Sequence, residues 1–327
     1  MRIAVVGAGA IGAYVGACLV RGGTETHLVA RGAHLSAMRA GGVRVIGPAE
    51  EFQVDVHATD DPRDIGHVDV VFLGLKAYSY AGAGDLLAPL LGPETAVVAA
   101  QNGIPWWYFH GHGGPFDGRR VESVDPGGAV TAVIPFARAI GCVVYPATEL
   151  AAPGVVRHIE GNRLSIGEPD RSDSERCRRI CEAVTAGGLK CRVTKDLRGE
   201  IWVKLLGNAT LNPLSALTGA TMAELCAFPA TRQLLAEMMG EVAAVAEAAG
   251  YPPRISVERR LDGAEAVGAH KTSMLQDLEA GKRLELEVLV EAVLEIGALV
   301  DVELPRLGAV HAATALLARS LRSLAGG

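Results

Sequence analysis

The sequence lacks a long apolar segment of the kind that crosses a membrane. A spanning helix needs about 18 or more consecutive residues that are predominantly apolar and uncharged. The nearest candidate, residues 3–20, is interrupted by glycines and follows a single basic residue, Arg2, without a separate charged region. A strand, a turn and a helix explain this segment better than a signal peptide does. We therefore expect no membrane association and a cytoplasmic location.

Basic charge is also in short supply. The chain carries 31 Lys and Arg residues against 37 Asp and Glu residues, which gives a formal net charge of −6. Proteins that bind nucleic acid usually present a basic surface. This balance therefore argues against nucleic acid as a partner.

Cysteine is scarce, since only six occur among 327 residues. Their scatter argues against the disulfide framework that is typical of small secreted domains. Cys177 and Cys181 lie four residues apart in a predicted helix, but no second metal-binding pair accompanies them, so we interpret them as buried or idle thiols. His110 and His112 likewise lack a clear third ligand. We expect no metal site.

The chain is long enough for about two domains, and its two parts differ in pattern. Up to about residue 195, strand-like runs such as 2–6, 26–31 and 68–75 alternate with helix-like segments such as 81–91. Such alternation predicts βαβ units. The rest is rich in Ala, Leu and Glu at helical spacing, which predicts helices at 197–217, 221–250, 271–280, 283–299 and 304–322. The predicted fold is α/β, with a Rossmann-type doubly wound sheet over 1–195 and an all-α domain over 196–327.

A glycine-rich motif, GAGAIG, follows the first predicted strand and begins a helix. Gly7 permits a tight turn, Gly9 lets a pyrophosphate approach the backbone, and Gly12 lets the helix pack on the strand. Ala10 and Ile11 lie at the helix N-terminus, where free N–H groups and the helix dipole favour phosphate. The motif predicts a dinucleotide site, and the alternative is an ordinary glycine-rich turn.

Three further residues lie where the carboxyl ends of the predicted strands meet. Arg31 stands at the end of the second strand, in the place where NAD-preferring sites usually carry Asp or Glu. A guanidinium suits a 2′-phosphate, so Arg31 favours NADPH, and a surface arginine is the alternative. Lys76 and Asn102 follow two later strands, at the edge where open α/β sheets bind ligands. A solvated lysine and a turn-forming Asn-Gly are the alternatives for these two residues.

Lys204, Asn208 and Asn212 recur every four residues in an otherwise apolar helical segment. Four residues turn a helix by roughly 400°, so the three side chains share one face. Pro213 follows, where the helix must bend or stop. Buried polar groups need partners. A substrate with a carboxylate and a carbonyl oxygen would supply them, and the alternative is a polar network that reaches other helices.

These motifs occur together in an order that resembles the ketopantoate reductase (2-dehydropantoate 2-reductase) family. The matching stretches are GAGAIG, LVAR, GLKAY, QNG, APGVVRHIEG, EIWVKLLGNATLNPLSAL and TSMLQDLEAGKRLELE. The resemblance covers nearly the whole chain. It implies NADPH-dependent reduction of a 2-keto acid to a 2-hydroxy acid, in a cleft between a Rossmann domain and a helical domain that carries substrate and catalysis.

The resemblance also implies roles for particular residues. The lysine that matches Lys204 acts as the general acid, and the glutamate that matches Glu285 anchors the substrate hydroxyl side. The remaining matches are substrate contacts at Asn208, Asn212 and Ser273, contacts near the nicotinamide at Asn102 and Lys76, and the 2′-phosphate contact at Arg31. From the residues alone, Glu285 also fits a solvated helix face, and Ser273 fits a helix N-terminal hydroxyl.

The stretch from Trp106 to Gly128 departs from the family by its length. It is aromatic, rich in glycine and aperiodic, and we expect a loop there. Trp106, Trp107, Tyr108 and Phe109 would line an apolar substrate pocket or cover an interface, which leaves open a bulkier or aromatic keto acid.

Two alternatives to a ketopantoate reductase follow. One is a D-2-hydroxyacid dehydrogenase of the same fold that acts on such bulkier acids. The other is a non-catalytic NADP(H)-sensing protein, which would have no need of a general acid at Lys204. The apolar helices also favour a homodimer.

Overall fold

The computed structural model describes residues 1–325, which form two compact units. The sheet unit contains Met1–Gln101, Trp106–Arg120 and Gly127–Leu197, and the helical unit contains Asn102–Pro105, Val121–Pro126 and the described residues from Arg198 onward. Two short segments of the first 195 residues therefore belong to the helical unit. Residues 326–327 of the predicted second domain lie outside the described residues.

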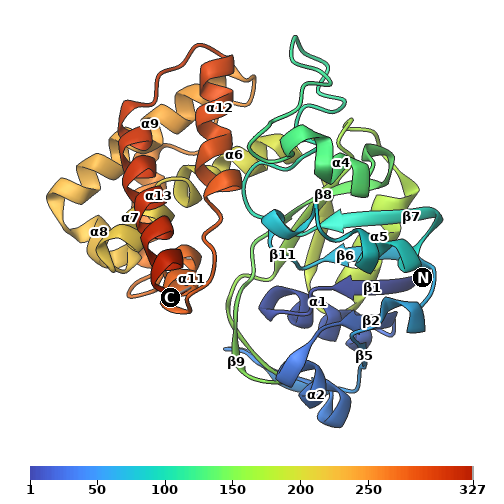
Figure 1. Cartoon of the computed structure of the whole chain (residues 1–327). Coiled ribbons are helices and arrows are strands. Elements are labelled where there is room, and N and C mark those ends of the chain that lie inside the picture. The colour runs from blue at the N-terminus through green and yellow to red at the C-terminus, as the bar shows by residue number, and fades with distance from the viewer. Residues whose placement is uncertain (326–327) are drawn as a thin grey trace. The chain divides into compact units, whose positions relative to one another are not determined.

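The sheet unit is built on an eight-stranded sheet (Figure 1). Its strand order is β12 (Lys190–Val193), β11 (Arg163–Gly167), β8 (Ala139–Val144), β7 (Leu91–Ala99), β6 (Val68–Leu73), β1 (Arg2–Val6), β2 (Glu25–Val29) and β5 (His57–Thr59). Neighbouring strands are parallel except β8 and β11. The order runs outward in both directions from β1, which confirms the predicted doubly wound fold.

The remaining strands of this unit form a second sheet of four strands. Its order is β4 (Glu51–Val54), β3 (Val43–Ile46), β10 (Val155–Glu160) and β9 (Ala147–Ala152). The helices of the sheet unit are α1 (Ala10–Arg21), α2 (Gly32–Gly41), α3 (Gly84–Leu87), α4 (Ala129–Val133) and α5 (Glu175–Ala186). The sequence did not indicate α2, and the helix expected near 81–91 is only the short α3 with a 3-10 turn at Ala88–Leu90.

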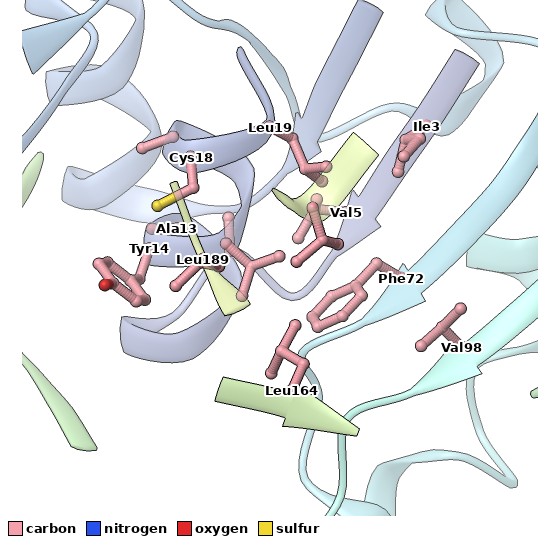
Figure 2. Packing of buried hydrophobic residues seen from close by; sticks show 14 of the residues in the cluster. Ile3, Val5, Ala13, Tyr14, Cys18, Leu19, Phe72, Val98, Leu164 and Leu189 are labelled. Atoms are coloured by element: carbon pink, nitrogen blue, oxygen red, sulfur yellow. The ribbon is translucent and has the colours of Figure 1, made fainter. Parts of the chain in front are cut away.

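The core of the sheet unit lies between the large sheet and α1 (Figure 2). Val5 and Phe72, from adjacent strands, pack with Leu19 of α1, and all three are buried. Gly16 lets α1 approach the sheet, because a Cβ there would lie 3.2 Å from the Leu28 side chain. This packing fixes the N-terminus of α1 at the carboxyl end of β1.

The aromatic segment Trp106–Phe109 is part of the core of the sheet unit. All four side chains are at most 2% exposed. Trp106 Nε1 donates to the Ile134 carbonyl at 3.1 Å, and Trp107 fills the space left by Gly141, where a Cβ would lie 2.3 Å from the indole ring. The prediction that these residues line a substrate pocket or cover an interface is wrong, because none presents an open surface.

The helical unit contains the remaining helices. They are α6 (Leu197–Asn208), α7 (Leu211–Thr218), α8 (Met222–Ala227), α9 (Pro229–Ala248), α10 (Val257–Ala266), α11 (Ser273–Glu279), α12 (Ala292–Leu299) and α13 (Pro305–Ala325), with a π-helical turn at Glu287–Glu291 before α12. No helix within residues 1–325 is long and apolar enough to cross a membrane.

Two predicted helices are each divided by a proline. The helix expected at 197–217 ends at Asn208 and resumes at Leu211, because Pro213 cannot donate to the carbonyl four residues earlier and its ring crowds that turn. The helix expected at 221–250 is divided at Pro229, which begins α9. The sequence also missed α10. Because α6 ends at Asn208 and α7 begins at Leu211, Asn212 lies on a different helix from Lys204 and Asn208.

Candidate functional site

The glycine-rich loop connects β1 to α1, and its backbone is tightly packed. Gly7 has a φ of +86°, and a Cβ there would lie 2.9 Å from the backbone N of Leu75. A Cβ on Gly12 would lie 2.3 Å from the carbonyl oxygen of Gly7. The N–H groups of Gly7 and Ala8 both donate to the Val29 carbonyl at 3.1 Å, which ties the loop to β2. Any larger side chain at Gly7 or Gly12 would displace backbone.

Gly9 differs from its two neighbours in the motif, because a Cβ there would meet no atom within 4 Å. The close packing that explains Gly7 and Gly12 therefore does not explain Gly9. Gly9 is the N-cap of α1, and the first N–H groups of a helix, here those of Ala10, Ile11 and Gly12, have no acceptor within the helix. Open space in front of free N–H groups at a helix N-terminus suits a pyrophosphate. The loop fits the dinucleotide that its sequence predicts.

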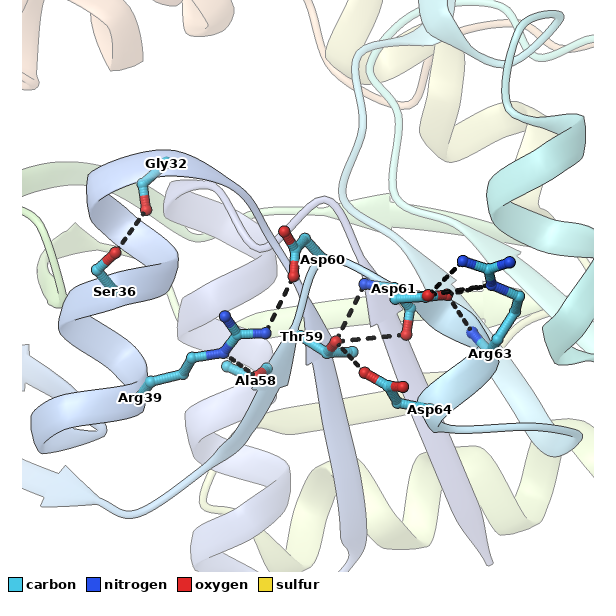
Figure 3. A network of polar contacts seen from close by, with 9 residues as sticks. All are labelled: Gly32, Ser36, Arg39, Ala58, Thr59, Asp60, Asp61, Arg63 and Asp64. Carbon is cyan, nitrogen blue, oxygen red and sulfur yellow. Dashed lines mark hydrogen bonds and ion pairs between the residues drawn. The ribbon is translucent and has the colours of Figure 1, made fainter.

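Arg31 lies two residues beyond the end of β2, as the N-cap residue of α2, and is exposed. A polar network attaches α2 to the neighbouring strand β5 (Figure 3). Arg39 of α2 donates from Nε to the Ala58 carbonyl at 3.0 Å and from Nη2 to Asp60 at 3.0 Å. Because β2 pairs with β1 through Val6 and Val29, Arg31 is held at the same sheet edge as the glycine loop.

Lys76 is carried by the segment that follows β6. Gly74 N donates to the Val6 carbonyl at 2.9 Å, and a Cβ on Gly74 would lie 2.4 Å from the Gly7 carbonyl oxygen. The chain therefore passes directly against the glycine loop before it reaches Lys76. Lys76 is half-buried and caps a 3-10 turn at Ala77–Ser79.

Lys204 and Asn102 meet in the helical unit. Lys204 Nζ, on α6, donates to Asn102 Oδ1 at 2.7 Å. The two residues lie 102 positions apart in the sequence, and Asn102 belongs to the helical unit although it follows a strand of the sheet unit. Both side chains are half-buried. The contact brings together two residues that the sequence predicts for one site.

The other polar residues predicted to contact substrate differ in their burial and hydrogen bonds. Asn208 is half-buried, and its side chain makes no hydrogen bond within residues 1–325. Asn212, on α7, is 5% exposed, and its Nδ2 donates to Ser273 Oγ at 3.4 Å. Ser273 begins α11, but the capping hydroxyl belongs to Thr272, which accepts from Leu275 N at 3.2 Å. The Ser273 hydroxyl is therefore not used as a helix cap.

Glu285 lies before the π-helical turn, in a segment without regular structure, and is buried. A solvated helix face is therefore the wrong interpretation for this glutamate. Ile104 N donates to the Val288 carbonyl at 2.9 Å, and a Cβ on Gly103 would lie 2.2 Å from the same oxygen. This contact ties the segment that carries Asn102 to the segment that carries Glu285.

Sequence reasoning missed Arg260, on α10. Its guanidinium lies over Gly207 of α6, where a Cβ would be 2.0 Å from Nη2. Burial lowers the pKa of Arg260, and its side chain makes no hydrogen bond or ion pair within residues 1–325. A desolvated cation without an anion is unfavourable. The available signal was Gly207 itself, next to Asn208 in a helix interior, where glycine is otherwise costly.

His110 and His112, which follow the aromatic segment, pack against aromatic rings. His110 stacks on Phe136 with ring centroids 4.4 Å apart, and the ring of His112 lies 5.3 Å from that of Phe109. Over the described part of the chain, no three or more His, Cys, Asp and Glu residues are grouped so that they could hold a metal ion.

Comparison with known proteins agrees with the fold and the motifs. Residues 3–111 match the family model described as "Ketopantoate reductase PanE/ApbA", and residues 196–318 match "Ketopantoate reductase PanE/ApbA C terminal". The chain is 50% identical over 319 residues to a 2-dehydropantoate 2-reductase of Mesorhizobium japonicum, with 97% of this chain and 98% of the relative covered.

Two solved structures are also similar. A putative ketopantoate reductase from Ralstonia solanacearum has a TM-score of 0.90 at 38% identity, with 98% of each chain covered. A 2-dehydropantoate 2-reductase from Geobacter metallireducens has a TM-score of 0.85 at 29% identity, with 97% of this chain and all of that chain covered. Fold and motifs define an NAD(P)-dependent oxidoreductase. More narrowly, the chain belongs to the ketopantoate reductase family.

Proposed function

We propose that this chain reduces 2-dehydropantoate (ketopantoate) to pantoate with NADPH, and that Lys204 donates the proton. The observation that carries the proposal is the hydrogen bond from Lys204 Nζ to Asn102 Oδ1 at 2.7 Å. It holds an ammonium group at a fixed place beside further polar side chains of the helical unit. Family membership supports the reaction, and the 50% identical relative is named for it.

The chemistry follows from what an ammonium group can do. When bound, the reduced nicotinamide supplies the hydride. As negative charge develops on the ketone oxygen, the Lys204 ammonium stabilises it and then transfers a proton from Nζ. Asn102 accepts a hydrogen bond from Lys204 Nζ and thereby fixes where the ammonium group lies.

Several residues of the helical unit would position the keto acid. Asn208 has an amide without a hydrogen-bond partner in the described residues, which suits it to a carbonyl or carboxylate oxygen. Asn212 and Ser273 form a second polar pair, and we assign both to substrate. Glu285 would accept from the substrate hydroxyl. We add Arg260, because a carboxylate would supply the anion that its desolvated guanidinium lacks.

The sheet unit would hold the dinucleotide. Gly7, Gly9 and Gly12 shape the loop, and the N-terminal residues Ala10 and Ile11 of α1 offer backbone N–H groups to the pyrophosphate. Arg31 would bind the 2′-phosphate, which is the basis for proposing NADPH over NADH. Lys76, on the segment packed against the loop, would contact the cofactor near the nicotinamide.

The aromatic alternative loses its support in the structure. A D-2-hydroxyacid dehydrogenase for bulky keto acids rested on Trp106, Trp107, Tyr108 and Phe109 as pocket walls, and all four are buried in the core of the sheet unit. The non-catalytic sensor would not need an ammonium held as Lys204 is. The homodimer stays a prediction, which sedimentation velocity tests.

Steady-state kinetics on the purified full-length chain test the proposal. We expect the highest kcat/KM for 2-dehydropantoate with NADPH, and lower values for an aromatic acid such as phenylpyruvate and for NADH. A higher kcat/KM for the aromatic acid would overturn the substrate assignment. Equal efficiency with NADH would overturn the assignment of the cofactor.

A further inference from the structure

Two cysteines of the sheet unit face one another across the contact between α5 and β12. Cys181 lies on the buried face of α5, with Cys177, Ile180 and Val184. Cys191 is the second residue of β12, whose exposed residues are Lys190 and Arg192. Because strand side chains alternate, Cys191 points away from the solvent side that Lys190 and Arg192 occupy. β12 is an edge strand of the large sheet.

The two sulfur atoms are 2.7 Å apart, and both cysteines are free thiols. A disulfide bond joins sulfurs at about 2.04 Å, so bond formation requires a movement of less than about 1 Å. The glycine turn at Gly187 and Gly188 brings the chain back from α5 to β12. The backbone already places the pair for a covalent link.

We propose that Cys181 and Cys191 are an oxidisable pair that forms an intramolecular disulfide with a peroxide as the oxidant. The Cys181 thiolate attacks one peroxide oxygen, the O–O bond breaks, and Cys181 becomes a sulfenic acid while the leaving hydroxide takes up a proton as water. The Cys191 sulfur then attacks the Cys181 sulfur, loses its proton, and a second water leaves. In sum, two thiols and one hydrogen peroxide give one disulfide and two waters.

The surroundings of the two thiols indicate which one attacks the peroxide and which one attacks the resulting sulfenic acid. A hydrogen bond from Cys191 lowers the pKa of Cys181, while the same contact and burial raise that of Cys191. The thiolate is the reactive form of cysteine, so Cys181 is the attacking residue and Cys191 the resolving one. Cys191 is half-buried, and Cys181 is 8% exposed, which leaves the pair accessible to a small oxidant.

Three other cysteines differ from the pair. Burial raises the pKa of Cys177 to about 11 and that of Cys18 to about 12, so both remain protonated near neutral pH. The Cys177 sulfur lies 3.8 Å from Glu168 Oε1. Burial also raises the pKa of Cys226, in the helical unit. These thiols serve as internal controls.

Thiol counting in the full-length chain tests the pair. After treatment with hydrogen peroxide and removal of the excess, the protein is unfolded in denaturant and its thiols are titrated. We expect the count to fall from six to four and to return to six with dithiothreitol. The Cys181→Ser and Cys191→Ser variants should form no disulfide, whereas Cys226→Ser should still lose two thiols.

Peptide mapping identifies the partners. Cleavage after lysine releases Cys191 in the pentapeptide 191–195, separate from the peptide 77–190 that contains Cys142, Cys177 and Cys181. We expect the pentapeptide to be linked to 77–190 before reduction, in wild type and in Cys177→Ser, and to be free in Cys181→Ser. A free pentapeptide in oxidised wild type, or a link lost in Cys177→Ser, would overturn the proposal.

Discussion

Lys204 Nζ donates a hydrogen bond to Asn102 Oδ1 over 2.7 Å, although α6 and the segment after β7 are far apart in the sequence. The bond fixes the position of the Lys204 ammonium group, and the neutral amide oxygen accepts the hydrogen bond without taking the proton. A general acid requires both properties, a fixed position and a proton to give. The proposed proton transfer depends on this pair.

Replacing Lys204 by Ala should remove the proton donor. We expect kcat to fall by roughly 10²-fold or more, while the dissociation constant for NADPH, measured by fluorescence titration, changes little. Lys190→Ala, an exposed lysine on β12, is the control and should retain wild-type kcat. Near-normal turnover in Lys204→Ala would contradict the assigned role.

Changing Asn102 should alter the pH dependence of turnover. In Asn102→Asp, a carboxylate stands beside the ammonium and favours its charged form. The basic limb of the kcat–pH profile, which reports loss of the acid's proton, should therefore move to higher pH. Asn102→Ala removes the acceptor without adding charge and should show no such upward movement. Identical profiles for wild type and Asn102→Asp would show that Asn102 does not act on the proton donor.

Alanine at Gly9 and at Gly12 should have different effects. A Cβ on Gly9 meets no atom within 4 Å, so Gly9→Ala should unfold at nearly the wild-type temperature but bind NADPH more weakly. A Cβ on Gly12 would clash with the Gly7 carbonyl, so Gly12→Ala should also lose roughly 1–3 kcal/mol of stability. Thermal unfolding and dinucleotide titration measure the two effects. Unchanged NADPH affinity in Gly9→Ala would place the pyrophosphate elsewhere.

Arg31→Ala should change the cofactor preference. The guanidinium is exposed, so its charge-assisted bond to a 2′-phosphate is screened, and we expect the KM for NADPH to rise roughly tenfold. The KM for NADH should change little, because NADH carries no 2′-phosphate. Equal changes in both KM values would instead indicate a general disturbance of the loop.

Buried thiols should weaken the fold at alkaline pH. Burial raises the pKa of Cys177 from 9.0 to about 11, so this thiol holds its proton in the folded state but loses it in the unfolded state between these values. The contribution of this thiol to the free energy of unfolding is therefore fully present below pH 9 and is lost as pH rises toward 11. Denaturant unfolding at pH 8 to 10.5 should show a falling free energy of unfolding. The slope should be smaller in Cys177→Ala, and an unchanged slope would exclude this thiol as a source.

Local patterns were enough to predict the sheet, the glycine loop and most helices. The glycine spacing and the apolar strand runs act over a few residues, and the structure has them where the sequence placed them. Pro213 indicated a bend or stop after Asn212, but the helix already breaks before Leu211, and helical periodicity on both sides concealed the break at Pro229. Proline geometry overrode that periodicity.

Other features depend on contacts between distant segments, which spacing does not report. The burial of Trp106 and its neighbours depends on Gly141 and Ile134, and the position of Asn102 depends on Val288. Arg260 was missed because its environment is set by Gly207 on another helix. Family resemblance indicated Glu285, while its burial before the π-helical turn became visible only in the structure.

The most direct test of the account is product analysis with the purified full-length chain, 2-dehydropantoate and NADPH. We predict that one pantoate forms for each NADPH oxidised, and that Lys204→Ala, with NADPH still bound, forms pantoate at a rate lower by roughly 10²-fold or more. Absence of pantoate from the wild-type reaction, with NADPH binding intact, would contradict the account.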